Sequence, residues 1–214
     1  MAVIKSGASS DQWTVDPTSK AGRVSLYDLA GNALFPSELA RGVANVLVRQ
    51  TATTAAGAAV WGLRNSSATR TINILRILFQ MSFDGTGAAT LMRYEWVKGT
   101  GVTTFSGGVA VTSAILKTSL GQGAGVDPRV LDTGLTTTGL VAGGSIYTAS
   151  HGRMTPSATV NACSGQHILD FSEIGMGPLE LAQNEILLLR NGPTNGSVIG
   201  DSVFGAVTFI EKLN

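Results

Sequence analysis

The densest group of reactive side chains in this sequence surrounds its single cysteine. Cys163 is followed by Ser164, His167 and Asp170, which are the residue types of a nucleophile, a base and an orienting acid. The members of a catalytic triad normally come from different elements, however, and no G-x-S-x-G motif is present. Because a small cysteine buried in a β protein explains the same residues more simply, we predict no catalytic residue and no enzyme activity.

The carboxylates suggest a second interpretation, in which two of them form the acid pair of a glycosidase active site. Four of them lie near one another in the sequence: Asp170, Glu173, Glu180 and Glu185. A sugar-binding cleft would be rich in Trp and Tyr, but aromatic residues make up only 6% of the chain. The three tryptophans, Trp13, Trp61 and Trp96, are scattered, which is typical of core or interface anchors.

Metal and phosphate sites also lack their usual residues. A zinc site needs three or four ligands, and His151 is remote in sequence from His167. The cluster Asp84-Gly85-Thr86-Gly87 lacks the repeated carboxylates of a calcium loop. The glycine-rich stretch 121–125 has no Lys, and Pro128 follows where a phosphate loop would start its helix. We therefore predict no metal and no cofactor.

Composition limits the partners. The 214 residues suit one β-sandwich or barrel with an arm. Charged residues make up only 14%, which favours protein contacts because little charge must be desolvated. The net charge of +1, without a Lys/Arg run, predicts no nucleic-acid partner, and the lack of a long apolar stretch predicts no membrane partner. The single cysteine fits assembly in a reducing cytoplasm.

Alternating side chains predict an all-β fold, a β-sandwich or jelly roll with an extended N-terminal arm. In residues 70–98, one face carries Leu75, Ile77, Phe79, Met81 and Phe83, and the return segment carries Met92, Tyr94 and Trp96. With a turn at 84–87, this pattern predicts a long hairpin whose apolar face needs a second sheet. Residues 185–190 and 202–211 predict two further strands. The second has apolar residues on both faces and should be central.

Several segments leave alternatives open. Residues 43–50 read as a strand, although Ser37–Val48 could form a helix capped by Ser37. Residues 109–120 could likewise be strand or helix, and 121–132 read as a long loop. Further expected strands are 60–64, 103–105, 109–116 and 135–146. Two extended pieces, 12–15 and 23–27, are separated by turns and bury little alone, so residues 1–40 are predicted to be an arm and 41–214 the sandwich domain.

The predicted arm also carries the most distinctive sequence. The segments Ile4–Ala8, Trp13–Ala21, Arg23–Asp28 and Gly31-Asn32 resemble the opening of structural proteins of tailed-bacteriophage particles. The resemblance implies a capsid cement or decoration protein that stabilises the phage head by protein contacts, or else a tail, neck or fibre component that binds the host surface or attaches a fibre.

The partners and location follow from this resemblance. It implies that the chain contacts other copies of itself, as a homotrimer, and the major capsid protein or another virion protein. It places the protein in the virion, after assembly in the host cytoplasm. The expected interface residues lie in the arm: Trp13, Val15, Pro17, Val24, Leu26 and Tyr27.

Overall fold

The strands expected from the alternating pattern are present in the computed structural model of the protein. It describes residues 3–5, 12–15, 22–24, 38–49, 56–83, 90–111, 114–118, 126–153, 162–163, 165–171, 177–193 and 201–213. Every regular element in these ranges is a β-strand, and the strands form sheets that stack as in a sandwich. The predicted all-β sandwich is therefore confirmed.

The chain divides into two compact units, Met1–Ser37 and Glu38–Asn214. The smaller unit holds three short strands, β1 (Val3–Lys5), β2 (Gln12–Val15) and β3 (Gly22–Val24), which form an antiparallel sheet with β2 in the middle. The predicted extended piece at 12–15 is confirmed as β2. In the larger unit β4 begins at Glu38, so residues 38–40 of the predicted arm belong to its first strand.

One layer of the larger unit is a seven-stranded sheet. Its strands are β4 (Glu38–Arg49), β6 (Arg70–Phe83), β9 (Ala114–Thr118), β12 (Ala162–Cys163), β13 (His167–Asp170), β14 (Leu179–Leu181) and β16 (Ser202–Leu213). The order is β12-β6-β16-β4-β9, and β13 and β14 also pair with β6. The predicted central position of β16 is confirmed, because β16 pairs with β6 on one side and β4 on the other.

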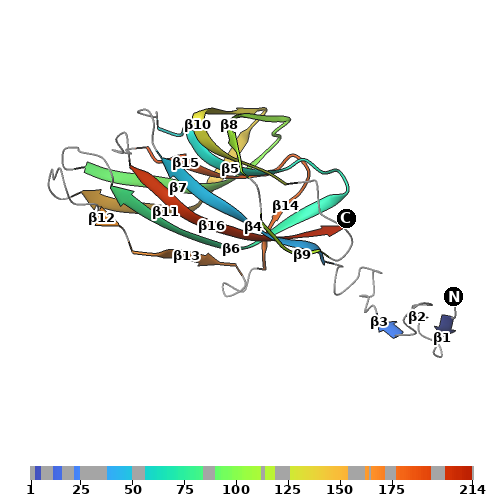
Figure 1. The fold of residues 1–214 in the computed structure, drawn as a ribbon. Helices are drawn as coiled ribbons and strands as arrows, with labels where there is room; N and C mark the ends of the chain where they lie inside the picture. Colours follow the sequence, from blue (N-terminus) through green and yellow to red (C-terminus); the bar gives the residue numbers. More distant parts are fainter. Residues whose placement is uncertain are drawn as a thin grey trace. The chain divides into compact units, whose positions relative to one another are not determined.

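The other layer is a six-stranded antiparallel sheet in the order β11-β7-β15-β5-β10-β8. Its strands are β5 (Ala59–Asn65), β7 (Thr90–Thr100), β8 (Thr104–Ala110), β10 (Val126–Thr138), β11 (Val141–Arg153) and β15 (Ile186–Asn191). Figure 1 shows the two layers of the larger unit stacked on each other, with β8 and β10 at the curled end of this sheet.

The predicted hairpin over residues 70–98 is wrong, although both of its strands exist. β6 belongs to the seven-stranded sheet, whereas β7 pairs with β11 and β15 in the other layer. Both edges of β6 are already taken, by β16 on one side and by β12, β13 and β14 on the other. Their apolar faces meet across the sandwich, where the rings of Phe79 and Trp96 pack edge to face with centroids 5.7 Å apart.

A β-bulge in β6 corrects the predicted register. Thr208 pairs with Arg76 and Phe209 with Ile74, so Leu75 is the extra residue. Ile74 is therefore fully buried in the core, and Leu75, which was expected there, is only partly buried. The carbonyl of Leu75 accepts a hydrogen bond from the backbone N–H of Phe171 at 3.0 Å.

Three weaker expectations are decided by long-range pairing. β4 is a strand, so the helix over Ser37–Val48 is wrong for the described residues 38–48. Residues 109–110 and 114–118 are also strand. The predicted loop at 121–132 is wrong from Val126 onward, because β10 pairs there with β5. Pro128 and the nearby glycines suggested a loop, but pairing with residues more than sixty positions away determines the strand.

A bent two-stranded ribbon curls the six-stranded sheet. β7 and β8 follow each other through residues 101–103, β10 and β11 through 139–140, and β7 pairs with β11 while β8 pairs with β10. Gly101 (φ 72°) and Gly139 (φ 79°) occupy the bend, where only glycine adopts these angles without strain. The bent ribbon flanks β15 and β5 and helps bury a small apolar cluster: Val102, Phe105, Ile186 and Leu188.

The main core lies between the two layers. Its largest fully buried side chains come from both sheets: Trp61, Trp96, Tyr94, Phe79 and Phe209. Trp61 and Trp96 meet edge to face at 5.6 Å, and the Trp61 indole N–H donates to the carbonyl of Asn45 at 3.1 Å, which links β5 to β4. The prediction that the tryptophans anchor a core is confirmed for these two, whereas the side chain of Trp13 lies outside the described set.

Candidate functional site

The structure spreads the cysteine–histidine–aspartate group along one edge of β6. Cys163 pairs with Ser82, His167 with Phe79 and Asp170 with Arg76. Each step is three residues along β6, or about 10 Å at the rise of a strand. An odd spacing also places His167 and Asp170 on opposite faces of the sheet. These residues therefore do not form a nucleophile–base–acid array, and Ser164 lies outside the described residues.

Three of the four carboxylates of the glycosidase interpretation lie within the described residues: Asp170, Glu180 and Glu185. Glu185 is held by the ammonium of Lys98 at 2.8 Å and by the backbone N–H of Ala182 at 2.7 Å. Glu180 lies on β14, in register with Asn73 of β6, and Glu173 lies outside the described residues. Across the described ranges, no three His, Cys, Asp or Glu side chains come close enough to hold a metal ion.

The predicted interface residues lie in the smaller unit. Trp13 and Val15 belong to β2, and Val24 belongs to β3, where it pairs directly with Trp13. Pro17, Leu26 and Tyr27 lie outside the described residues, as do the stretches 84–87 and 121–125. The register thus brings two of the predicted residues side by side, and their role as an interface stays a prediction.

Two histidines that are remote in sequence gather with aromatic rings from both layers. We call this group the histidine edge: Phe79, Phe83, Tyr147, His151 and His167. The His167 ring stacks on Phe79 with centroids 4.9 Å apart, and the His151 ring stacks on Phe83 at 4.8 Å. The Tyr147 hydroxyl and His167 Nδ1 lie 3.2 Å apart in a hydrogen bond. The histidine edge thereby ties β11 to β6 and β13.

The histidine edge favours the neutral form of His167. Burial lowers the pKa of His167 below its ordinary 6.5, and the charge of His151 lowers it further. His151 Nε2 is buried without a hydrogen-bond partner among the described residues. Acid would therefore add charge to His167 inside a stacked, partly buried cluster. No local sequence signal points to it, because His151 and His167 are brought near each other only by the folding of the two layers.

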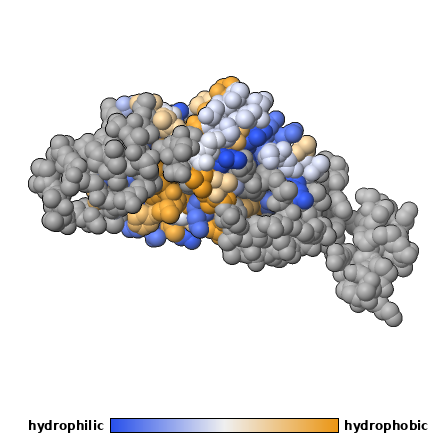
Figure 2. Space-filling model, turned by 45° about the horizontal axis from the view of Figure 1, so that its top comes forward, coloured by the Kyte–Doolittle hydropathy of each residue, from blue (hydrophilic) through white to orange (hydrophobic). Residues whose placement is uncertain are grey.

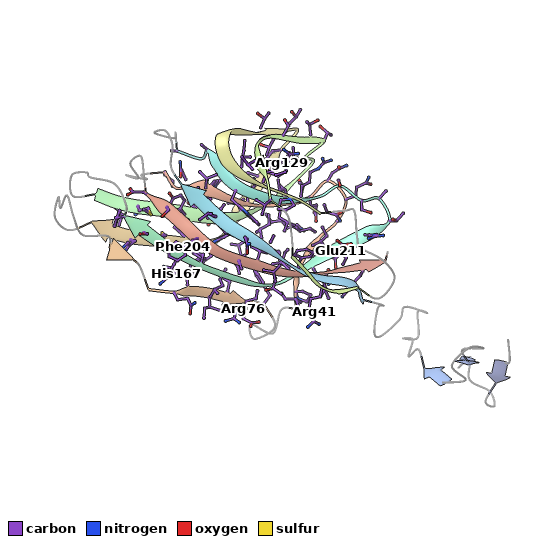
Figure 3. All side chains as sticks on the ribbon, in the orientation of Figure 1. Arg41, Arg76, Arg129, His167, Phe204 and Glu211 are labelled. Atoms are coloured by element: carbon purple, nitrogen blue, oxygen red, sulfur yellow. The ribbon has the colours of Figure 1, made fainter. Side chains whose placement is uncertain are left out.

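A buried ion pair lies at one end of β16. Glu211 is 0% exposed, and its Oε2 lies 2.9 Å from Nη1 of Arg70, which is 24% exposed. Figure 3 marks Glu211 near the C-terminal end of β16. Removing Arg70 would leave the buried carboxylate of Glu211 without its cation, so this pair acts on stability.

The surface of the seven-stranded sheet that points away from the core carries apolar side chains among polar ones. We call it the outer face. Its apolar members are Val43 and Leu47 of β4, Leu78 of β6, Ile168 of β13, and Phe204, Ala206 and Ile210 of β16. Leu47 is 66% exposed and Ile168 49%. Figure 2 shows hydrophobic side chains gathered on part of the surface of the larger unit, and Figure 3 marks Phe204, Arg41 and Arg76 on strands of this sheet.

The sequence of β16 carries a signal for this face, but the pattern alone predicts a covered surface. Phe204, Ala206 and Ile210 share the side of β16 that carries Thr208, and this pattern predicted that both faces of the strand are covered. In the structure these three side chains are only partly buried, among their neighbours in the sheet. A one-sided antiparallel sheet usually carries polar residues on its solvent side. The outer face is therefore the strongest candidate interaction surface among the described residues.

Comparison with known proteins gives no family for the chain. In the part of the chain that the structure describes, no helix is long and apolar enough to cross a membrane. No known family model matches the chain, and no curated protein and no solved structure shows significant similarity to it.

Proposed function

We propose that the chain is a structural protein of a bacteriophage particle, of the capsid cement or decoration type, which acts through contacts with other proteins. The observation that carries the proposal is the outer face, where the exposed Leu47 and Ile168 are joined across the sheet by partly buried apolar neighbours: Phe204, Ala206 and Leu78. Contiguous apolar surface of this kind marks sites of protein interaction. The resemblance of residues 4–32 to virion proteins supplies the setting.

The arrangement of the reactive residues supports a role without turnover. Cys163, His167 and Asp170 stand about 10 Å apart along β6, and Glu185 is engaged by Lys98 and a backbone N–H. The large buried aromatic residues fill the space between the sheets. A filled sandwich with an apolar outer surface is suited to binding other proteins rather than to enclosing a substrate.

Electron microscopy of labelled particles tests this proposal. Gold-labelled antibodies raised against the larger unit should decorate the heads of intact particles from the phage that encodes the chain. Label confined to the tail or fibres would overturn the cement role and support the alternative, a tail or fibre component. Absence of label from particles, with label recovered only in the soluble lysate, would overturn the virion assignment itself.

A further inference from the structure

The two sheets of the larger unit have four edges in the part of the chain that the structure describes, and three of them carry features that keep another strand from joining. One edge of the seven-stranded sheet consists of β12, β13 and β14, which have only two, four and three residues. The other is β9, which has five residues and includes Lys117. In the six-stranded sheet, the edge strand β8 contains Gly107 and Gly108, both with positive φ, which interrupt its extended backbone. The fourth edge is β11.

The second half of β11 has none of these features. Residues 147–153 pair with β7 in an unbroken register, from Tyr147 opposite Trp96 to Arg153 opposite Thr90. This stretch contains no lysine and no proline. Among the described residues, no strand other than β7 pairs with it, and no backbone hydrogen bond from outside the sheets reaches it. The stretch therefore presents a straight edge about 24 Å long, whose outward N–H and C=O groups have no strand partner in the described chain.

Exposure alternates along this edge. Thr148, Ser150 and Gly152 are exposed, and Ala149 is buried. The exposed residues are small and uncharged, so neither bulk nor charge on them opposes a second strand. An edge of this kind is recognised by an extended backbone rather than by a particular side chain.

We propose that two copies of this chain pair antiparallel through residues 147–153 of β11, which joins their six-stranded sheets into one. Pairing of two edges needs a second free edge of similar length, and within the described residues of the chain only β11 offers one. A two-fold axis perpendicular to the sheet at Ser150 gives the symmetric register that pairs all seven residues. Thr148 of each copy then lies opposite Gly152 of the other, and the two copies of Ser150 lie opposite each other.

This arrangement leaves the outer face available. An axis perpendicular to the sheets keeps the same side of both copies in the same direction, so the two outer faces lie next to each other and point the same way. The pair can therefore present both outer faces to another protein. It goes beyond the proposed function, because it names a second contact and the chain's own copy as the partner there.

The size of the contact predicts a weak pair. It runs about 24 Å along the strand, and the two layers of a sandwich lie about 10 Å apart, so each copy contributes roughly 300 Å². A stable complex usually buries about 800 Å² on each partner. Isolated chains should therefore pair only at high concentration, whereas copies held close together on a particle would pair readily. The inference rests on the proposed structural role only for this crowding.

Sedimentation velocity of the full chain over a wide concentration range tests the pairing. Ser150→Glu places two carboxylates opposite each other at the centre of the contact, and Thr104→Glu places the same charge at an exposed position of β8. The wild-type chain and Thr104→Glu should form dimers as the concentration rises. Ser150→Glu should weaken the dimer about fivefold, because like charges directly opposite each other repel. Circular dichroism checks that both variants are folded.

Cysteine cross-linking tests the register, in a Cys163→Ala background that removes the native thiol. Ser150→Cys places two thiols opposite each other across the axis, where the Cα separation suits a disulfide. Thr148→Cys, also exposed on β11, places them four residues apart, or about 14 Å along the strands. Oxidation should therefore link Ser150→Cys into dimers roughly tenfold faster than Thr148→Cys.

Four results would overturn the pairing. They are monomers at every concentration without cross-linking, equal losses of association in Ser150→Glu and Thr104→Glu, equal cross-linking of the two cysteine variants, and a trimer that Ser150→Glu leaves intact. None of them would alter the labelling of particle heads, so a failed pairing and a failed virion assignment are distinguishable.

Discussion

The imidazole of His167 lies flat against the ring of Phe79, with centroids 4.9 Å apart and planes inclined by 17°. The two residues are direct partners across β13 and β6, so the stack is fixed by the pairing of the strands. Tyr147, from the other layer, reaches the same imidazole through its hydroxyl. His167, which lies on the edge strand β13, thus contacts both β6 of its own sheet and β11 of the opposing sheet. Its environment therefore depends on the packing of the two layers against each other.

Acid should weaken the fold through His167. Burial and then His151 lower the pKa of His167 in the folded chain below the 6.5 of an unfolded histidine. As the pH falls below 6.5, the unfolded chain takes up this proton first, so the free energy of unfolding decreases until the pH passes the folded pKa. One proton changes that free energy by at most about 1.4 kcal/mol per pH unit, and the partial exposure of the ring keeps the effect smaller.

Urea denaturation between pH 7 and pH 5 measures this effect. His167→Gln should remove part of the pH dependence, since glutamine does not titrate. Tyr147→Phe deletes the hydroxyl but keeps both histidines, so it should retain the wild-type slope. If His167→Gln lost stability with acid as steeply as the wild type, His167 would not be the group responsible.

Removal of Arg70 should lower the free energy of unfolding by more than its partly exposed position suggests. Arg70→Ala leaves the carboxylate of Glu211 buried without its cation, and we expect a loss of about 2–3 kcal/mol in the free energy of unfolding. Lys98→Ala is the control, because its partner Glu185 is more exposed and keeps a backbone N–H, so the loss should stay under about 1 kcal/mol. Equal losses, measured by urea denaturation, would contradict the importance of the buried pair.

A methyl group at Gly205 should disturb the centre of the seven-stranded sheet. A Cβ there would overlap the carbonyl oxygen of Leu78 and lie 2.7 Å from the Cα of Phe79, both backbone atoms that cannot move alone. Gly205→Ala should therefore cost about 2–3 kcal/mol. Gly144 has nothing within 4 Å of its Cβ position, and Gly144→Ala should stay within about 0.5 kcal/mol of the wild type. Thermal unfolding of both variants decides, and a tolerated Gly205→Ala would show that β16 and β6 can separate freely.

The division into two units predicts that they can be separated. A chain of residues 38–214 should keep its β-type circular dichroism and unfold cooperatively, because every core residue that the structure describes lies in the larger unit. If the smaller unit attaches the protein to its particle, as the resemblance of residues 4–32 implies, the shortened chain should no longer bind particles stripped of the native protein. Undiminished binding in a co-sedimentation assay would contradict that role.

The sequence predicted strand positions better than strand partners. Alternation identified β6, β7 and β16 because it reports the two faces of a strand, which is a local property. It gave no access to pairing, so β6 and β7 were joined in a hairpin although β6 pairs with β16, more than a hundred residues away. The bulge at Leu75 was missed for the same reason, since an extra residue is defined only against a partner strand.

The candidate sites show the same limit. The nearness of Cys163, His167 and Asp170 in sequence suggests chemistry, but their partners on β6 are three residues apart, which separates successive members by about 10 Å along the strand. The histidine edge was not predicted, because it combines His151 and His167 from strands on different layers. The apolar outer side of β16 was visible in the sequence, and only the exposure of Leu47 and Ile168 revealed that this side is a surface.

The measurement that tests the proposed function most directly is quantitative mass spectrometry of gradient-purified particles of the phage that, on this proposal, encodes the chain. The account predicts that the protein co-purifies with intact particles in a copy number comparable with that of the major capsid protein. A few copies per particle would point to a tail component. Absence from purified particles, with the protein abundant in the infected cell, would contradict the structural role.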